Sequence, residues 1–292
     1  MAHLAQRRTE NVSGDLYVDS TCIDCDTCRW MAPQVFHRDR AQSAVFHQPM
    51  MNTKDRLQAL QALLACPTAS IGTVDPPKDI RTAQQSFPIP VTNMVYQCGY
   101  HAENSYGAAS YFIQRTDGNI LVDSPRFTPT LVKQLEAMGG IRYLYLTHRD
   151  DVADHQKFHD HFGCDRILHE DDITQETRSV EQPLSGTDPV ELAPDLTIIP
   201  VPGHTKGHTV LLYRHQVLFS GDHLAWSNEL QHLIAFRHAC WYSWPILLGS
   251  MKALLDYSFE WVLPGHGRRY HAPAQAMHQA LAQCIDWMVM QQ

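Results

Sequence analysis

The sequence predicts an α+β chain of two domains, and three features of its 292 residues support that prediction. Four of the eight cysteines fall within residues 22–66. A stretch at 77–90 is rich in proline and polar residues, which is the composition of a linker. From residue 91 onward, short apolar stretches of strand character alternate with helical patterns, as expected for sheets covered by helices. We therefore expect a small domain at 1–76 and a larger domain at 91–292.

Charge and composition narrow the class of protein. The formal net charge is −8, whereas a nucleic-acid-binding protein needs a basic face, so no nucleic-acid partner is expected. No apolar run reaches the roughly 18 residues of a transmembrane helix, and the first residues lack the apolar core of a secretory signal. These features predict a cytoplasmic protein that acts on a small-molecule substrate and has no membrane partner.

The small domain contains one clear helical pattern. Residues 1–15 are polar and are expected to be loosely ordered. Leu57, Leu60 and Leu64 recur at helical spacing and predict a helix over 53–65, with Asn52 or Thr53 as its N-cap.

Three cysteines share one loop of the small domain. Cys22, Cys25 and Cys28 recur at every third position and can bind three corners of a cubane cluster, while the remote Cys66, followed by proline, supplies the fourth ligand. A structural zinc site is the alternative, but such sites usually pair two C-x-x-C knuckles. Residues 16–73 resemble a single-cluster bacterial ferredoxin. The resemblance implies one [4Fe-4S] cluster bound by these four cysteines, either structural or active in electron transfer to a partner.

The larger domain is expected to contain many short strands. The predicted strands span 92–98, 108–114, 118–122, 141–146, 165–169, 196–200, 209–214, 216–220 and 260–263. The predicted helices span 128–138, 151–162, 244–257 and 272–290.

Histidines and aspartates follow several of these strands, each presented by a glycine or proline turn. The motifs are Asp123, Thr147-His148, Pro202-Gly203-His204-Thr205-Lys206-Gly207-His208, Ser220-Gly221-Asp222 and Pro264-Gly265-His266-Gly267. Loops at strand ends are where metal sites are commonly built, and imidazole with carboxylate suits zinc, iron or manganese. In order and content the motifs resemble the metallo-β-lactamase superfamily. This resemblance implies an αββα sandwich with one or two divalent ions.

One motif departs from the family pattern, His-x-His-x-Asp-His. The chain reads His-Arg-Asp-Asp-Val-Ala-Asp-His over 148–155. Without a gap, Asp150 replaces the second histidine, and valine and alanine replace the final pair. With a two-residue shift, Asp154 and His155 restore that pair. Asp151 fits less well, and either Asp150 or Asp151 can instead cap a helix.

The expected metal ligands are His148, Asp150, Asp154, His155, His204, Asp222 and His266, with Asp150 and Asp154 as catalytic residues. His208 is expected to support its loop, and His169 and His223 to orient ligands. Asn104 or Tyr106 either contacts the substrate or belongs to a polar hairpin loop. Trp241 and Trp244 are expected to form a pocket floor or part of the core.

The resemblance implies a hydrolase that acts on an ester, thioester or phosphoester through a metal-bound hydroxide. The metal would be zinc, or iron or manganese if Asp150 makes the site harder. Two alternatives belong to other classes. One is a diiron-type oxidoreductase fed by the ferredoxin domain, and the other is a non-catalytic redox or iron sensor with a degenerate metal site.

Overall fold

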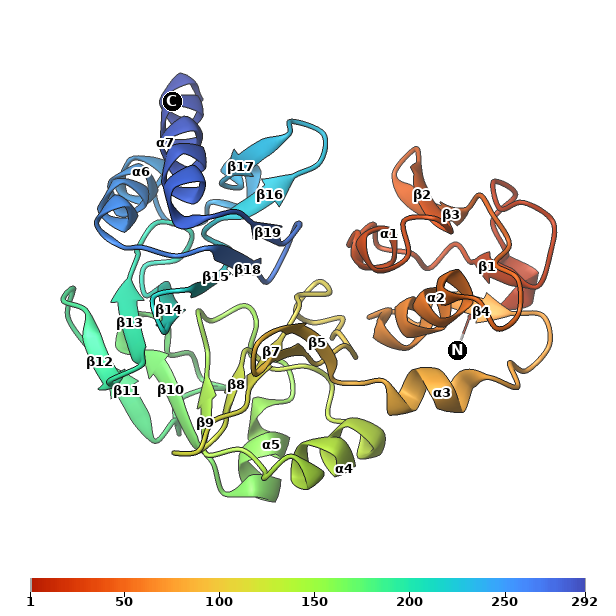
Figure 1. Cartoon of the computed structure of the whole chain (residues 1–292), viewed down its shortest axis with the longest axis horizontal. Helices are drawn as coiled ribbons and strands as arrows, with labels where there is room; N and C mark the ends of the chain where they lie inside the picture. The colour runs from red at the N-terminus through yellow and green to blue at the C-terminus, as the bar shows by residue number, and fades with distance from the viewer. Residues whose placement is uncertain (1, 292) are drawn as a thin grey trace. The chain divides into compact units, whose positions relative to one another are not determined.

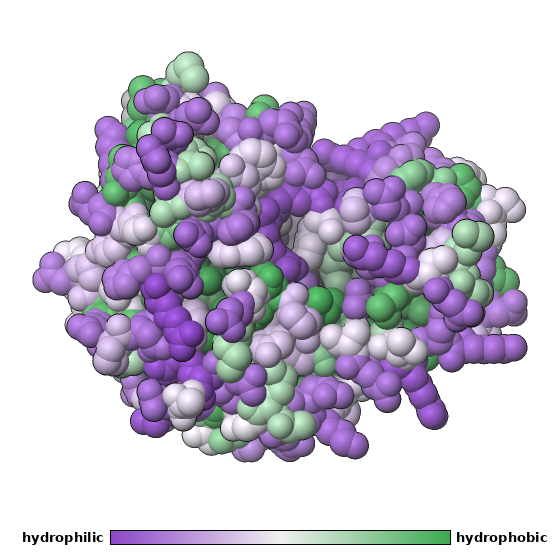
Figure 2. Space-filling model, viewed as in Figure 1, coloured by the Kyte–Doolittle hydropathy of each residue, from purple (hydrophilic) through white to green (hydrophobic). Residues whose placement is uncertain are grey.

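The computed structural model describes residues 2–291, which form two compact units (Figure 1). The first unit runs to Asn119 and takes in Pro125–Ile141, whereas the second contains Ile120–Ser124 and continues from Arg142. Within the described residues, every helix is too short or too polar to span a bilayer. Polar residues predominate on the face seen in Figure 2, and apolar ones are dispersed among them.

The N-terminal part of the first unit is built from short elements around the cysteines. They are η1 (Leu4–Gln6), β1 (Leu16–Val18), α1 (Thr27–Met31), β2 (Phe36–Asp39), β3 (Gln42–Val45), α2 (Lys54–Ala65) and β4 (Ile71–Thr73). β1 pairs with β4 and β2 with β3, both antiparallel. The predicted helix over 53–65 corresponds to α2, and the Thr53 side chain caps it by accepting a hydrogen bond from Arg56 N.

The start of the chain is ordered by a buried asparagine. The Asn11 side chain donates to Val18 O at 2.8 Å and accepts from Val45 N at 3.0 Å. These bonds replace ladder contacts at the end of β3, because a buried backbone donor requires a partner. The expectation of a loosely ordered segment is therefore wrong for residues 2–15.

The segment 77–90, expected to be a linker, contains the helix α3 (Ile80–Gln85). Asp79, which precedes α3, accepts hydrogen bonds from Arg56 of α2 at 3.0 and 3.2 Å. The antiparallel strands β5 (Ile89–Thr92), β6 (Val95–Gln97) and β7 (Tyr111–Ile113) and the helix α4 (Pro129–Ala137) complete this unit.

The second unit contains four parallel strands that place their C-terminal ends at one edge. They are β8 (Ile120–Val122), β9 (Tyr143–Tyr145), β10 (Asp165–His169) and β11 (Gln182–Leu184). The helix α5 (His155–Phe162) joins β9 to β10. The ligand-bearing motifs after β8 and β9 therefore lie at the same edge.

The second unit also contains a six-stranded sheet, in the order β12-β13-β14-β15-β18-β19. Its strands are β12 (Val190–Ala193), β13 (Leu196–Pro200), β14 (Thr209–Tyr213), β15 (Val217–Gly221), β18 (Trp261–Pro264) and β19 (Tyr270–His271). One face packs on α6 (Trp244–Ala253) and α7 (Ala274–Met290) through a core that includes Leu212, Leu218, Val262, Leu247 and Leu281. The remaining elements are η2 (Glu170–Asp172), β16 (Ala225–Ser227), β17 (His232–Ile234), η3 (Arg237–Ala239) and η4 (Leu254–Asp256).

Candidate iron–sulfur site and metal centre

The four cysteines expected to bind a cluster line one cavity in the first unit. Cys22 and Cys25 lie in the loop before α1, Cys28 lies in α1, and Cys66 is the C-cap of α2. All four are free thiols, and Cys28 and Cys66 are buried.

Two of the sulfur atoms accept backbone hydrogen bonds. Ser43 N donates to Cys22 Sγ at 3.4 Å, and Ser70 N donates to Cys66 Sγ at 3.3 Å. Such N–H donors favour thiolate over thiol. Burial acts in the opposite direction and raises the pKa of the Cys66 thiol, so a positively charged centre is needed to hold it deprotonated.

The spacing of the sulfurs distinguishes a cluster from a single ion. Thiolates around one tetrahedral zinc lie about 3.8 Å apart, given the Zn–S bond length. Among the described residues, the groups whose ligand atoms all lie within 4.8 Å of one another include no cysteine. A polynuclear cluster therefore fits this cavity better than a zinc ion.

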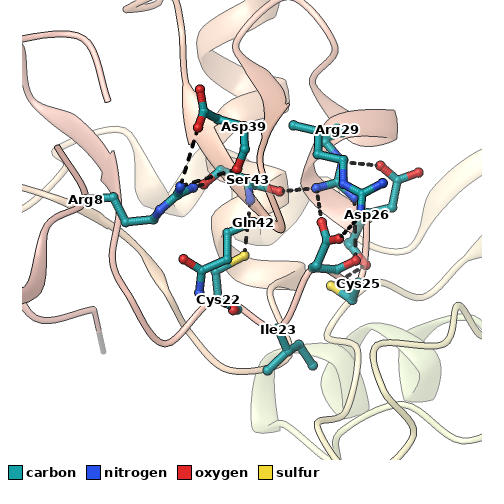
Figure 3. Close-up of polar contacts among 12 residues, drawn as sticks. Arg8, Cys22, Ile23, Cys25, Asp26, Arg29, Asp39, Gln42 and Ser43 are labelled. Carbon is teal, nitrogen blue, oxygen red and sulfur yellow. Dashed lines mark hydrogen bonds and ion pairs between the residues drawn. The ribbon is translucent and has the colours of Figure 1, made fainter. Parts of the chain in front are cut away.

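The cysteine loop is held by a buried arginine (Figure 3). Arg29 Nη1 donates to Asp24 Oδ1 at 2.5 Å and to Ser43 Oγ at 2.8 Å, and Nε donates to Asp26. Asp24 and Asp26 have φ of 61° and 66°, which most residues avoid. The ion pairs hold this backbone in place and so position the sulfurs on either side of it.

The metal centre of the second unit begins with four convergent side chains. His148 Nε2 lies 3.8 Å from both Asp150 Oδ2 and Asp222 Oδ2. His204 Nε2 lies 3.5 Å from Asp150 Oδ2 and 3.7 Å from Asp222 Oδ2. Within the described chain neither Nε2 has a hydrogen-bond partner, although both histidines are buried. Ligand atoms of His148, Asp150 and His204 lie within 4.8 Å of one another, as around one divalent ion, and Asp222 borders this first group.

A second group adjoins the first and includes Asp151. Ligand atoms of His148, Asp151 and Asp222 lie within 4.8 Å of one another. Asp151 is 1% exposed, and neither of its carboxylate oxygens has a hydrogen-bond partner within the described chain. His266 Nδ1 lies 2.7 Å from Asp222 Oδ1, whereas Asp222 Oδ2 is the oxygen near His148 and His204.

Gly265 allows the two carboxylates to approach each other. A Cβ at this position would lie 2.7 Å from Asp151 Oδ2 and 3.0 Å from Asp222 Oδ1. Any larger residue would push one of these oxygens out of the group.

The electrostatics of the site suit a cation. Burial lowers the pKa of His148 to about 4, so its imidazole is neutral, as a metal ligand must be. Burial raises the pKa of Asp151 well above its ordinary value, and the charge of Asp222 adds to this effect. Burial also opposes ionisation of Asp222, but His266, followed by His148 and His204, outweighs it and lowers the pKa of that carboxyl.

Thr147 and Asp123 orient the first histidine. His148 Nδ1 lies 2.9 Å from Thr147 Oγ1, and that hydroxyl donates to Asp123 at 2.9 Å. This arrangement leaves Nε2 to face the centre. Burial raises the pKa of Asp123 to about 7.

Asp172, in η2, joins two ligand loops, and we did not single it out from the sequence. It accepts from Arg149 N at 3.1 Å, from Gly207 N at 2.8 Å and from the Thr205 hydroxyl. A signal was available, because Asp172 follows the strand at 165–169 by three residues, as the other site residues follow theirs. His208 also has a supporting role, as expected: its Nε2 accepts from Asp222 N at 3.2 Å.

Asp154 and His155 lie outside both groups. Asp154 Oδ1 contacts Lys157 Nζ at 2.8 Å at the start of α5. His155 Nδ1 lies 3.2 Å from Arg166 Nη1, and burial, followed by that guanidinium, lowers its pKa to about 4. The structure therefore places Asp151 at the centre, and not Asp154 and His155, which the alignment with a two-residue shift selected.

The other expected neighbours divide between the site and the core. Trp241 is exposed with its ring 6.3 Å from that of His204, and its backbone N donates to His204 O at 2.9 Å. Trp244 is buried in the core and donates to Met288 O. His169 contacts Gly186 O instead of a ligand, and His223 is fully buried.

Comparisons with known proteins agree with both parts of this description. Residues 18–73 match the family described as the 4Fe-4S single cluster domain of Ferredoxin I. No curated protein matches the chain. The structure is similar to that of VMB-1 at pH 5.5, with 17% identity, a TM-score of 0.53, and coverage of 69% of this chain and 95% of VMB-1.

Two further structures are similar to the same degree. The DIM-1 metallo-β-lactamase has 18% identity and a TM-score of 0.53, with coverage of 68% of this chain and 95% of its own. The metallo-β-lactamase FIM-1 from Pseudomonas aeruginosa, in its mono-zinc form, has 18% identity and a TM-score of 0.50, with coverage of 68% and 93%. At these identities the likeness shows the fold. The chain thus combines a [4Fe-4S] ferredoxin-type domain with a metallo-β-lactamase fold whose described residues include two groups that could hold a metal ion.

Proposed function

We propose that this chain is an iron–sulfur-containing, metal-dependent hydrolase that acts on an ester, thioester or phosphoester. The observation that carries the proposal is the convergence of two buried, unpartnered imidazole nitrogens on the carboxylate oxygens of Asp150 and Asp222, at 3.5–3.8 Å. A divalent ion held by these atoms would lower the pKa of water and polarise the carbonyl or phosphoryl oxygen of a substrate.

The residues around this centre have separable roles. His148, His204, Asp150 and Asp222 bind the ion, and Thr147 fixes the imidazole of His148. Asp150 is 43% exposed at its side chain and forms the solvent-facing rim through which a substrate enters. A metal site with buried histidine ligands and one solvent-exposed ligand is open to a small molecule, whereas a structural metal site is closed.

Asp151 acts as a proton carrier or as a ligand, depending on metal loading. Burial raises the pKa of the Asp151 carboxyl, and in its protonated form this carboxyl could donate a proton to a leaving oxygen or sulfur. A second ion bound by Asp151, Asp222 and His266 would displace that proton, because ligands must be deprotonated. Metal stoichiometry therefore decides between the two roles.

A second candidate function is oxidation or reduction. The centre offers three carboxylates, from Asp150, Asp151 and Asp222, which favour iron or manganese over zinc. A [4Fe-4S] domain in the same chain can supply single electrons from an external electron-transfer partner.

Metal analysis of anaerobically purified protein separates the candidates. The cluster accounts for about four irons and four sulfides per chain. One or two further zinc ions support hydrolysis, further iron with reductant-dependent turnover supports the redox function, and no further metal supports a sensor.

An activity assay then tests the leading proposal. A panel of aryl esters, thioesters and phosphodiesters is measured with His204→Ala and with His278→Ala, whose side chain is exposed on α7. We expect His204→Ala to lower the hydrolysis rate at least about 100-fold, since it removes a metal ligand, and His278→Ala to leave it unchanged. If hydrolysis by His204→Ala equals that of the control, the metal mechanism is wrong.

A further inference from the structure

Residues well downstream of the matched region 18–73 pack against residues that line the cysteine cavity. Gly107 packs directly on Cys25: a Cβ at Gly107 would lie 2.9 Å from Cys25 Cβ, 3.1 Å from Cys25 Sγ and 3.2 Å from Pro67 Cγ. Gly107 also has a φ of +86°, which favours glycine. Its backbone therefore forms a wall behind Cys25 and Pro67, which both line the cavity.

A buried hydroxyl connects this wall to a cysteine sulfur. Thr27 Oγ1 lies 3.4 Å from Cys25 Sγ and 3.1 Å from His101 Nδ1. His101 Nδ1 also lies 2.7 Å from Gly107 O, and both Thr27 and His101 are at most 1% exposed.

The carbonyl of Gly107 fixes the direction of these bonds. A carbonyl only accepts, so His101 Nδ1 carries the proton and donates it. The same N–H faces Thr27 Oγ1 as donor, so the Thr27 hydroxyl hydrogen has two acceptors at 3.4 Å, Gly107 O and Cys25 Sγ. A cluster-bound sulfur has no proton of its own and can only accept that hydrogen. His101 thereby leaves Thr27 as a donor that the sulfur and the Gly107 carbonyl share.

Two more contacts from downstream residues secure the cysteine segments. The Tyr106 hydroxyl donates to Ile23 O, within the cysteine loop, at 2.5 Å. Arg126 Nη2 donates to Leu64 O at 2.9 Å and to Cys66 O at 3.1 Å, which places a cation at the last turn of α2.

From these contacts we propose that the cluster occupies a composite site, in which His101, Tyr106, Gly107 and Arg126 form the downstream half and position the cysteines. Gly107 and Tyr106 shield the cluster from solvent, whereas the Thr27 hydroxyl and the Arg126 cation stabilise its reduced, more negative state. Hydrogen bonds to sulfur, nearby charge and solvent exposure are the factors by which a protein sets cluster potential. This inference is independent of the hydrolytic proposal.

The wall is tested in the full-length chain with Gly107→Ala. Gly186→Ala is the matched control, because its φ is +85° and nothing lies within 4 Å of the added Cβ. Iron and acid-labile sulfide per chain and the rate at which the visible cluster absorbance decays in air are measured for both. We expect Gly107→Ala to retain less than half the iron or to lose its cluster at least five-fold faster than the control. Equal iron content and equal decay rates overturn the wall.

Milder variants test positioning where Gly107→Ala fails to fold. Tyr106→Phe removes one hydroxyl from an exposed side chain, and Tyr242→Phe is its control at a tyrosine of similar exposure. Thr27→Val is compared with Thr27→Ser, which keeps the hydroxyl. We expect faster cluster loss in Tyr106→Phe, and a more negative midpoint potential in Thr27→Val that Thr27→Ser restores. If the potentials of both Thr27 variants match the wild type and Tyr106→Phe decays at the control rate, the composite site is refuted.

Discussion

Replacing Asp151 by asparagine should have opposite effects on the metal-free and metal-loaded protein. The Asp151 carboxyl is 1% exposed, lacks hydrogen-bond partners within the described chain, and has a ligand atom within 4.8 Å of one of Asp222. Without metal, the two negative charges repel each other. With metal, the same carboxylate contributes a bond that asparagine forms poorly.

The size of the first effect follows from the distance. Two unit charges 4.8 Å apart repel by about 3 kcal/mol at an effective dielectric constant of 20. Removing one charge should therefore stabilise the metal-free protein by up to about 3 kcal/mol, or raise Tm by roughly 5–10 °C. The gain depends on pH. Because burial raises the pKa of Asp151, the folded protein keeps this proton to a higher pH than the unfolded chain does. The free energy of unfolding of the wild type therefore falls as pH rises above the unfolded-state pKa of Asp151, and the variant lacks this fall.

The assay is thermal unfolding of the full chain at pH 6 and pH 9, with and without a divalent-metal chelator, followed by metal counts. We expect Asp151→Asn to exceed the wild type in Tm when metal-free, most at pH 9, and to fall below it when metal is added. Asp154→Asn is the control, because it removes a nearby carboxylate charge that contacts Lys157 and lies outside both ligand groups. An Asp151→Asn protein with wild-type metal content and wild-type Tm in every condition would refute the assignment of Asp151 to the centre.

Three further predictions follow from contacts at other positions. Asp172→Asn should weaken metal binding about 10- to 100-fold in chelator competition, because Asp172 joins the loops that carry two ligands. Cys66→Ser should lower iron below about four per chain while zinc content is unchanged. Burial opposes ionisation of Glu181, but hydrogen bonds from Arg166 outweigh the effect of burial and lower the pKa of Glu181 to about 2. The stability that this ion pair contributes is therefore present above about pH 4.5 and is lost as pH falls toward 2. Glu181→Gln should accordingly cost about 1 kcal/mol in denaturant unfolding at pH 7, after allowance for solvent screening, and less at pH 3.

Hydrophobic periodicity predicted most of the larger helices and strands, because the apolar residues that each of them buries recur at helical or strand spacing in the sequence. β13, β14 and α7 lie within or close to their predicted ranges. β5 was not predicted, since Pro88 and Pro90 flank and interrupt it. The helix expected from 151 begins at His155, because the preceding residues turn toward the metal centre and Ala153 has a φ of 28°.

The expectation that ligands follow strand ends brought His148, His204 and Asp222 near one another, as the structure has them. It could not choose among the neighbouring aspartates. Asp150, Asp151 and Asp154 are equivalent by composition and by helix-capping preference. Asp150 and Asp151 both face the centre, and Asp151 has room there because Gly265, more than 100 positions away in the sequence, has no side chain. A contact of this kind is set by the tertiary fold and leaves no local pattern.

The charges of the centre make a final prediction about ligands. With three carboxylates ionised and neutral imidazoles, one divalent ion leaves the centre with one net negative charge, or neutral if Asp151 keeps its proton. Two divalent ions leave one net positive charge. An anionic ligand should thus bind the two-metal form more tightly than the one-metal form.

The binding of inorganic phosphate, measured calorimetrically at one and at two equivalents of added zinc, tests this prediction. We expect at least about 10-fold tighter binding at two equivalents, and we expect Asp151→Asn to abolish the difference. Equal phosphate affinity at both loadings would show that Asp151 does not share in a second ion.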